Sequence, residues 1–458
     1  MNHMKQLVII LFAVALSSCK KYLDKKSDTS LVVPSTLEDF QALMDRSATM
    51  NLITPSTGEA SADDYFLLPD TYNAQSDLLK KIYTWVPRDY NYSNDWSNCY
   101  LSVYVANLCL ERLPLVPKTA SNESKWNYIK GAALFYRSYA FLNLVWLHGK
   151  AYDASTSDTD PGIVLRLSSD VNTQSVRASV KACYDTVIAH TKEAVQYLPD
   201  FAENVYRPSK VAAYALLARA YLSMRKYSEA LQYADLCLGK QNYLIDFNGD
   251  PVINGSLSGT APFKSYQFNG EIIFYSQMNR NTSLIFPAQA RIDTLLYQQY
   301  DANDWRRTAF FRSIGGYVQF KGNYSGNANF HFSGLATDEM FLIRAECYAR
   351  EGNVALAMAD LNTLMQKRWK NSVPFPTFEA LDADEALDLI LTERRKELVM
   401  RGLRWIDIKR LNKEGRNIEL TRVLPDGSVV KLLPNANYYA LPLPKDIIDM
   451  TGIPQNEY

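Results

Sequence analysis

Apolar side chains recur at every third or fourth position over long parts of the chain, which is the spacing of amphipathic helices. Ser35 and Thr36 precede the first such segment, and either can cap a helix. Pro114, Gly149 and Pro199 follow three longer segments, and these residue types commonly end helices. The pattern therefore predicts helices over residues 37–44, 96–113, 126–148 and 180–198.

Two later stretches share one internal spacing. In both, an alanine is followed by a tyrosine three residues later and by a second alanine twelve residues later, at Ala218, Tyr221 and Ala230 and again at Ala345, Tyr348 and Ala357. This spacing resembles the tetratricopeptide repeat, an antiparallel pair of helices. Residues 138–149 look like a weaker copy. Such repeats must stack to cover their apolar faces. We expect a mainly α fold of stacked helix pairs, with ordinary helix hairpins as the alternative.

Two stretches interrupt the helical pattern, residues 51–94 and 246–335. They are rich in polar, glycine and aromatic residues, and short alternating runs at 271–276 and 317–320 predict strands. A hairpin is expected within 415–439. We therefore expect two long irregular loops with a few short β-strands. Long loops inside a compact domain are usually functional.

The N-terminus has the organisation of a bacterial signal peptide. Lys5 precedes an apolar run of about ten residues, whereas a spanning helix needs roughly 20. The run ends in Leu16-Ser17-Ser18-Cys19, which resembles a lipobox, so Cys19 is the expected lipidation site. An unlipidated signal peptide is the alternative. The expected organisation is a signal peptide over 1–18, lipidated Cys19 with a tether over 19–30, and a single domain over 31–458.

Composition excludes several classes of function. Lys plus Arg and Asp plus Glu both number 49, so the chain has no general attraction for nucleic acid. The other five cysteines are widely spaced in apolar patterns, which favours buried thiols over disulfides. The four histidines are isolated, and no zinc-protease, Cys-x-x-Cys or Gly-x-Ser-x-Gly motif occurs. We therefore predict no metal, no cofactor and no catalytic activity.

Several motifs together resemble the SusD/RagB family of outer-membrane nutrient-uptake lipoproteins. The strongest match is Glu393-Arg394-Arg395-Lys396-Glu397-Leu398 followed by Gly402-Leu403-Arg404-Trp405-Ile406-Asp407-Ile408-Lys409-Arg410. Here Glu393 and Glu397 lie one helical turn apart, Trp405 is expected to pack inward, and Arg404, Asp407 and Arg410 can form a charge network. Further matches lie at 18–24, 96–107, 130–149, 207–219 and 441–456. Arg401, Thr451-Gly452 and the end of the chain depart from the family pattern.

The resemblance implies a function in binding rather than in catalysis. Family members are lids on a SusC-like TonB-dependent β-barrel, capture a glycan or another nutrient, and are anchored by lipid at the outer membrane, facing outward. Aromatic loop residues can stack on sugars, and charged ones can hold hydroxyls. The candidate ligand-binding residues are Asp64, Tyr65, Trp85, Tyr90, Tyr92, Trp96, Tyr266, Tyr275, Arg280 and Tyr324. The alternatives are a protein-binding repeat scaffold in the cell envelope and a surface glycosidase.

Overall fold

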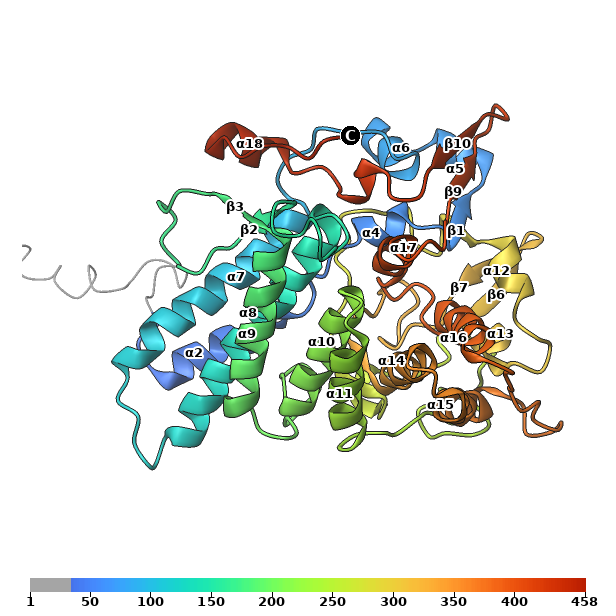
Figure 1. The fold of residues 1–458 in the computed structure, drawn as a ribbon, viewed down its shortest axis with the longest axis horizontal. Coiled ribbons are helices and arrows are strands. Elements are labelled where there is room, and N and C mark those ends of the chain that lie inside the picture. The colour runs from blue at the N-terminus through green and yellow to red at the C-terminus, as the bar shows by residue number, and fades with distance from the viewer. Residues whose placement is uncertain (1–33) are drawn as a thin grey trace, which may run out of the picture.

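A computed structural model of the protein describes residues 34–458, so the predicted signal peptide, Cys19 and the tether lie outside the described residues. The described chain is mainly helical (Figure 1). The helices that build the body are α2 (Leu37–Met44), α7 (Asp95–Arg112), α8 (Glu123–His148), α9 (Val180–Tyr197), α10 (Lys210–Ser223), α11 (Tyr227–Leu238), α14 (Thr337–Arg350), α15 (Val354–Arg368), α16 (Ala383–Glu397) and α17 (Arg404–Asn412).

The helix boundaries follow from local chemistry. Thr36 caps α2 in a capping box with Asp39, and Asn94 caps α7 in the same way with Ser97. Each cap satisfies backbone N–H groups that have no partner inside the helix. The predicted helices at 37–44, 96–113, 126–148 and 180–198 are confirmed to within three residues at each end.

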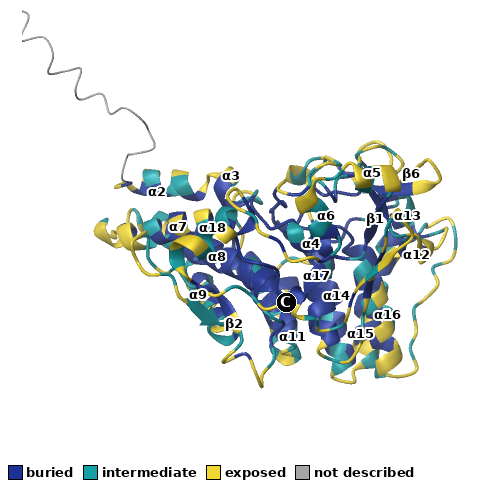
Figure 2. Ribbon diagram, turned by 90° about the horizontal axis from the view of Figure 1, so that it is seen from above, coloured by how far each residue is buried: buried dark blue, intermediate teal, exposed yellow. Residues whose placement is uncertain are grey.

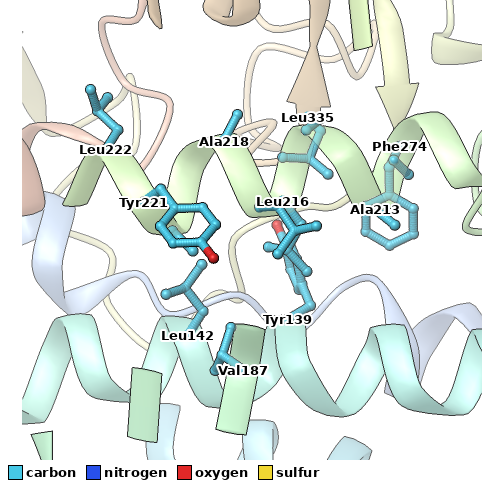
Figure 3. Packing of buried hydrophobic residues seen from close by; sticks show 14 of the residues in the cluster. Tyr139, Leu142, Val187, Ala213, Leu216, Ala218, Tyr221, Leu222, Phe274 and Leu335 are labelled. Atoms are coloured by element: carbon cyan, nitrogen blue, oxygen red, sulfur yellow. The ribbon is translucent and has the colours of Figure 1, made fainter. Parts of the chain in front are cut away.

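The predicted repeats are also confirmed as helix pairs. α10 packs against α11, α14 packs against α15, and α11 and α14 join the two pairs. Ala218, Ala230, Ala345 and Ala357 are fully buried, because small side chains allow the helix backbones to approach closely. Figure 3 shows Tyr221 projecting from α10 toward Leu142 and Val187 of the neighbouring helices, as a gap-filling side chain does.

Residues 51–94 are more regular than expected, so the prediction of an irregular loop there is corrected. This stretch contains α4 (Thr57–Ser61), β1 (Tyr65–Leu67), α5 (Pro69–Asn73) and α6 (Asp77–Tyr83), and α3 (Ser47–Met50) immediately precedes it. Helices this short are not stable alone and depend on tertiary packing. They span too few residues to show a full apolar period, which is why the sequence pattern does not reveal them.

Short two-stranded sheets complete the fold. The described strands are β2 (Pro161–Val164) with β3 (Arg177–Ser179), β4 (Ile272–Phe274) with β8 (Leu335–Ala336), β6 (Phe311–Ile314) with β7 (Tyr317–Phe320), and β9 (Leu420–Val423) with β10 (Val429–Leu432). The fifth sheet pairs β1 with β5 (Ala290–Ile292), and it joins the two insertions, with Tyr65 opposite Ile292. The strands predicted at 271–276, 317–320 and 415–439 are confirmed. Two short helices, α12 (Thr294–Gln298) and α13 (Trp305–Ala309), lie in the second insertion, and α18 (Lys445–Thr451) is the last helix of the chain.

Most charged side chains of the motif at 393–398 and 402–410, which we call the family-signature segment, are buried. The Arg306 guanidinium bonds Asp304 at 2.7 Å, Glu397 at 3.0 Å and also Glu393. Trp405 is buried, and Asp407 pairs with Arg410 at 2.7 Å, as predicted. Arg404 instead pairs with Asp63 at 2.7 Å. The expected network of three residues is therefore two separate pairs, Asp407 with Arg410 and Arg404 with Asp63. Figure 2 shows buried residues, in dark blue, along α8, α14 and α17.

All five cysteines of the described chain are buried and free, which confirms the prediction of core thiols. Among residues 34–458 no helix is both long and apolar enough to cross a bilayer. The same residues contain no cluster of side chains arranged to hold a metal ion.

Candidate ligand-binding site

Six of the ten predicted site residues are buried: Asp64, Tyr65, Trp85, Trp96, Tyr275 and Tyr324. Most of their polar atoms are hydrogen-bonded to other groups of the protein. Asp64 accepts from Arg395 Nε at 2.9 Å, the Tyr65 hydroxyl donates to Ala60 O at 2.6 Å, and Trp85 Nε1 donates to Ser61 O at 2.9 Å. The Asp64 bond joins the first insertion to α16, whereas the Tyr65 and Trp85 bonds lie within that insertion.

The other four predicted residues are at least partly exposed, at separate places. Tyr92 is 80% exposed, and its ring is free of the core. The Arg280 guanidinium lies over the rings of Phe286 and Phe330, 4.9 and 5.4 Å from their centroids. Tyr90 is half-buried, with its hydroxyl donating to Pro442 O at 2.6 Å. Contact of Tyr90, Tyr92 and Arg280 with a ligand stays a prediction.

Tyr266, the fourth, lines a hollow of about 930 Å³. We call it the tyrosine hollow, after the rings of Tyr206, Tyr266 and Tyr275. It lies between the end of α2, the segment before α10 and the segment leading into β4. Its volume is typical of small-molecule sites. Its walls include Asp45, Ser47, Asn51, Tyr136, Phe201, Glu203, Asn204, Tyr206, Arg207, Gln241, Tyr266, Gln267, Phe268 and Asn269.

Tyr206 packs edge to face against Tyr266 and Tyr275, and the Tyr266 and Tyr275 rings are tilted by 43°. Ring centroids are 4.5 Å apart for Tyr266 and Tyr275, 4.9 Å for Tyr206 and Tyr266, and 5.0 Å for Tyr206 and Tyr275. Tyr275 is buried beneath the two half-buried rings and supports them. Burial raises the pKa of both Tyr206 and Tyr275, so their hydroxyls remain neutral at physiological pH. The result is a fixed aromatic platform beside the hollow.

Hydrogen bonds hold the platform in place from below. Asn51 Nδ2 donates to the carbonyl oxygens of Tyr206 at 2.9 Å and Tyr275 at 2.8 Å. The Tyr136 hydroxyl donates to Tyr206 O at 2.8 Å, and Tyr275 N donates to Val205 O at 2.7 Å. Three segments far apart in sequence are thus tied together before any ligand arrives. Such preorganisation reduces the entropic cost of binding.

Amide groups and exposed rings flank the platform. Asn269 is buried, its Oδ1 accepts from Glu271 N at 3.0 Å, and its Nδ2 donates to no group among the described residues. An unsatisfied buried donor is uncommon and is often explained by a ligand or water. Phe268 and Phe201 are 67% and 57% exposed at the rim. The hollow therefore combines apolar faces with hydrogen-bonding groups, the mixture that binds sugars.

A second hollow lies along α7 and has a volume of about 740 Å³. We call it the α7 groove. Trp96, Tyr100 and Tyr104 are spaced by four residues and therefore share one face of α7, with Tyr92 beyond the helix start. The structure thus brings two predicted site residues, Tyr92 and Trp96, to this groove. A smaller cleft of about 120 Å³ contains Tyr90 and Asn281.

Sequence reasoning missed most of the tyrosine hollow. Tyr206 directly precedes the motif at 207–219, and Phe268 and Asn269 follow the predicted Tyr266. The run Tyr266-Gln267-Phe268-Asn269 alternates rings with amides, and this signal could have identified the rim. Asn51 carries no such signal, because its role depends on contacts with residues more than 150 positions away.

Two family models match the chain over most of its length. Residues 21–222 match a model described as "Starch-binding associating with outer membrane", and residues 263–444 match the model of the SusD family. The chain therefore belongs to the SusD/RagB family, a class of carbohydrate-binding, outer-membrane-associated proteins. The structure confirms the mainly α fold that the sequence predicts for this chain.

Individual relatives agree with this assignment. The chain is 25% identical over 414 residues to SusD-like protein P2 of Formosa agariphila, covering 76% of each chain. A solved putative sugar-binding protein from Bacteroides vulgatus shares the fold with a TM-score of 0.75 at 21% identity, covering 93% of this chain and 99% of the other. A laminarin-binding SusD-like protein matches with a TM-score of 0.65 at 18% identity, covering 91% and 97%.

Proposed function

We propose that this protein is a cell-surface lipoprotein that captures a glycan in the tyrosine hollow and delivers it to a SusC-like TonB-dependent outer-membrane transporter. The observation that carries the proposal is the preorganised tyrosine platform bordering a hollow of about 930 Å³. Sugar rings present apolar C–H faces that stack on aromatic side chains, while their hydroxyls bond amides. The solved laminarin-binding relative with the same fold supports a glycan as the ligand.

The mechanism requires binding and release, with no bond made or broken in the ligand. The platform would hold one sugar face, and the exposed side chain of Gln267 would meet hydroxyl groups at the edge. Because the Asn51 and Tyr136 side chains bond the Tyr206 carbonyl, this part of the platform is already ordered before a ligand binds. The family assignment and this geometry both favour a binding protein over a glycosidase or a scaffold.

Isothermal titration of the purified chain with a panel of glycans tests the proposal. We expect Tyr266→Ala to weaken binding of the best ligand at least about tenfold, or ~1.4 kcal/mol, because it removes an exposed face of the platform. Tyr104→Ala, in the α7 groove, is the matched control and should leave that affinity unchanged. Hydrolysis of any glycan during the titration would instead support the enzyme alternative.

Anchoring and partnership need separate experiments. Mass spectrometry of the mature protein should find an acylated Cys19, and Cys19→Ala should release the protein from membranes. Extraction of the wild-type protein in mild detergent should recover a large β-barrel transporter with it. Recovery of other envelope proteins without such a barrel would favour the scaffold alternative.

A further inference from the structure

The charges around the tyrosine hollow restrict the class of glycan that it can accept. Only three lining residues carry a charge, Asp45, Glu203 and Arg207; the remaining lining side chains are apolar, amide, hydroxyl or phenol groups. The net charge of the lining residues is therefore −1. A ligand entering the hollow meets two carboxylates and one guanidinium.

That guanidinium is already engaged by the protein. Arg207 Nε donates to Asp45 Oδ1 at 2.8 Å and Nη2 donates to Asp45 Oδ2 at 2.6 Å, while Nη1 pairs with Glu203. Its flat face lies over the Tyr128 ring, 5.6 Å from the centroid. The hydrogen bonds to Asp45 raise the pKa of Arg207, so it stays charged and paired. No lining cation is left to pair with an anionic ligand.

The remaining polar groups of the hollow are neutral. The side chain of Asn269 carries no charge, and the Tyr206 phenol stays protonated because burial raises its pKa above the ordinary value. Amides and phenols can both donate hydrogen bonds to hydroxyl groups and accept them, and neither partner carries a charge that must be neutralised. A carboxylate or sulfate placed here would lose water without gaining a cation, and it would be repelled by Asp45 and Glu203.

We infer that the tyrosine hollow selects uncharged glycans and discriminates against glycans that carry carboxylate or sulfate groups. This inference rests on the proposed function and specifies its ligand class. It follows from the pairing of Arg207 with two carboxylates and from the neutral donors that line the rest of the site.

The test uses matched pairs of glycans. Starch, laminarin and mannan are titrated into the purified chain, each beside its carboxymethylated derivative. We expect at least one neutral glycan to bind and its carboxymethylated form to bind at least about tenfold more weakly. Salt at about 1 M should reduce this ratio, because screening weakens charge repulsion and leaves a steric effect unchanged.

A charge reversal tests whether the discrimination against anionic glycans arises at the hollow. Glu203→Lys should improve binding of the carboxymethylated form severalfold relative to the neutral form, since it replaces a carboxylate at the rim with a cation. Glu457→Lys makes the same charge change at an exposed residue outside the hollow and should alter neither affinity. Tyr266→Ala should weaken the neutral ligand, which ties the selectivity to this site.

The outcomes separate the two levels of the hypothesis. Absence of binding to every glycan would overturn the proposed function and the inference with it. Binding of a carboxymethylated glycan as tightly as its neutral parent would overturn the inference alone. Loss of neutral binding in Tyr104→Ala but not in Tyr266→Ala would place the ligand in the α7 groove and would also overturn it.

Discussion

At the scale of single residues, the family-signature glutamates act through buried charge pairs. Glu393 and Glu397 both bond Arg306, and Glu397 also accepts from Arg368 Nε at 2.8 Å. Both arginines are fully buried. The acidic motif therefore joins α16 to α13 and α15, which explains its position on one helix face.

Removal of Arg306 should destabilise the fold strongly. Arg306→Met leaves three buried carboxylates without their shared cation, and breaking a buried pair on one side costs about 3–5 kcal/mol. The control is Arg416→Met, which breaks a more exposed pair with Asp388 and should cost at most about 1 kcal/mol. Urea unfolding of both variants measures the difference. Equal losses would contradict the assignment of Arg306 as a central structural cation.

At the scale of elements, alanines determine how closely the helices of each pair approach. Ala357 on α15 is fully buried against its neighbours, whereas Ala359, two positions on, faces solvent. Gly352, with φ of 80°, makes the turn between α14 and α15, a conformation that favours glycine. The pair is thus specified by small residues inside and by a glycine at the turn.

Enlarging the buried alanine should separate the pair. Ala357→Leu adds volume to a closely packed interface, and such overpacking typically costs about 1–3 kcal/mol. Ala359→Leu makes the identical change on the exposed face of the same helix and should lie within about 0.5 kcal/mol of the wild type. Thermal and urea unfolding would compare the two variants. An unchanged stability for Ala357→Leu would indicate an interface looser than the structure shows.

At the scale of the whole molecule, three histidines, two of them buried and one half-buried, favour the neutral form in the folded state. Burial lowers the pKa of His148 to about 3, and that of His190 and His331 to about 4. In the unfolded chain each would titrate near 6.5. Because their folded pKa values are depressed, these histidines contribute stability above pH 6.5 that is lost as the pH falls toward their folded values.

The contribution of His148 can be isolated. Its Nδ1 lies 3.1 Å from Leu441 O, and its ring packs on Trp96. His148→Gln keeps a hydrogen-bond donor but cannot titrate, so the decline in unfolding free energy between pH 6 and 4 should become shallower by up to about 1.4 kcal/mol per pH unit. Urea titrations at several pH values give this slope. An identical slope in the variant would show that His148 is not buried as a neutral ring.

Much of the fold was predictable because local patterns determine it. The long helices span many turns, so their apolar period identifies them, and their caps are short-range features such as Thr36 with Asp39. The hairpin of β9 and β10 follows from the turn at Pro425-Asp426-Gly427. The short helices α4 to α6 were not predictable, because they depend on packing against the rest of the molecule.

The sequence by itself determined the helices, the repeat of small residues, the buried cysteines and the family to which the chain belongs. Tertiary structure alone decided which aromatic residues remain accessible. Tyr266 and Tyr275 both belong to the second insertion, yet Tyr275 is buried and Tyr266 borders the hollow. Burial of a ring depends on which distant segments pack over it, and here residues near positions 51, 206 and 270 meet only in three dimensions.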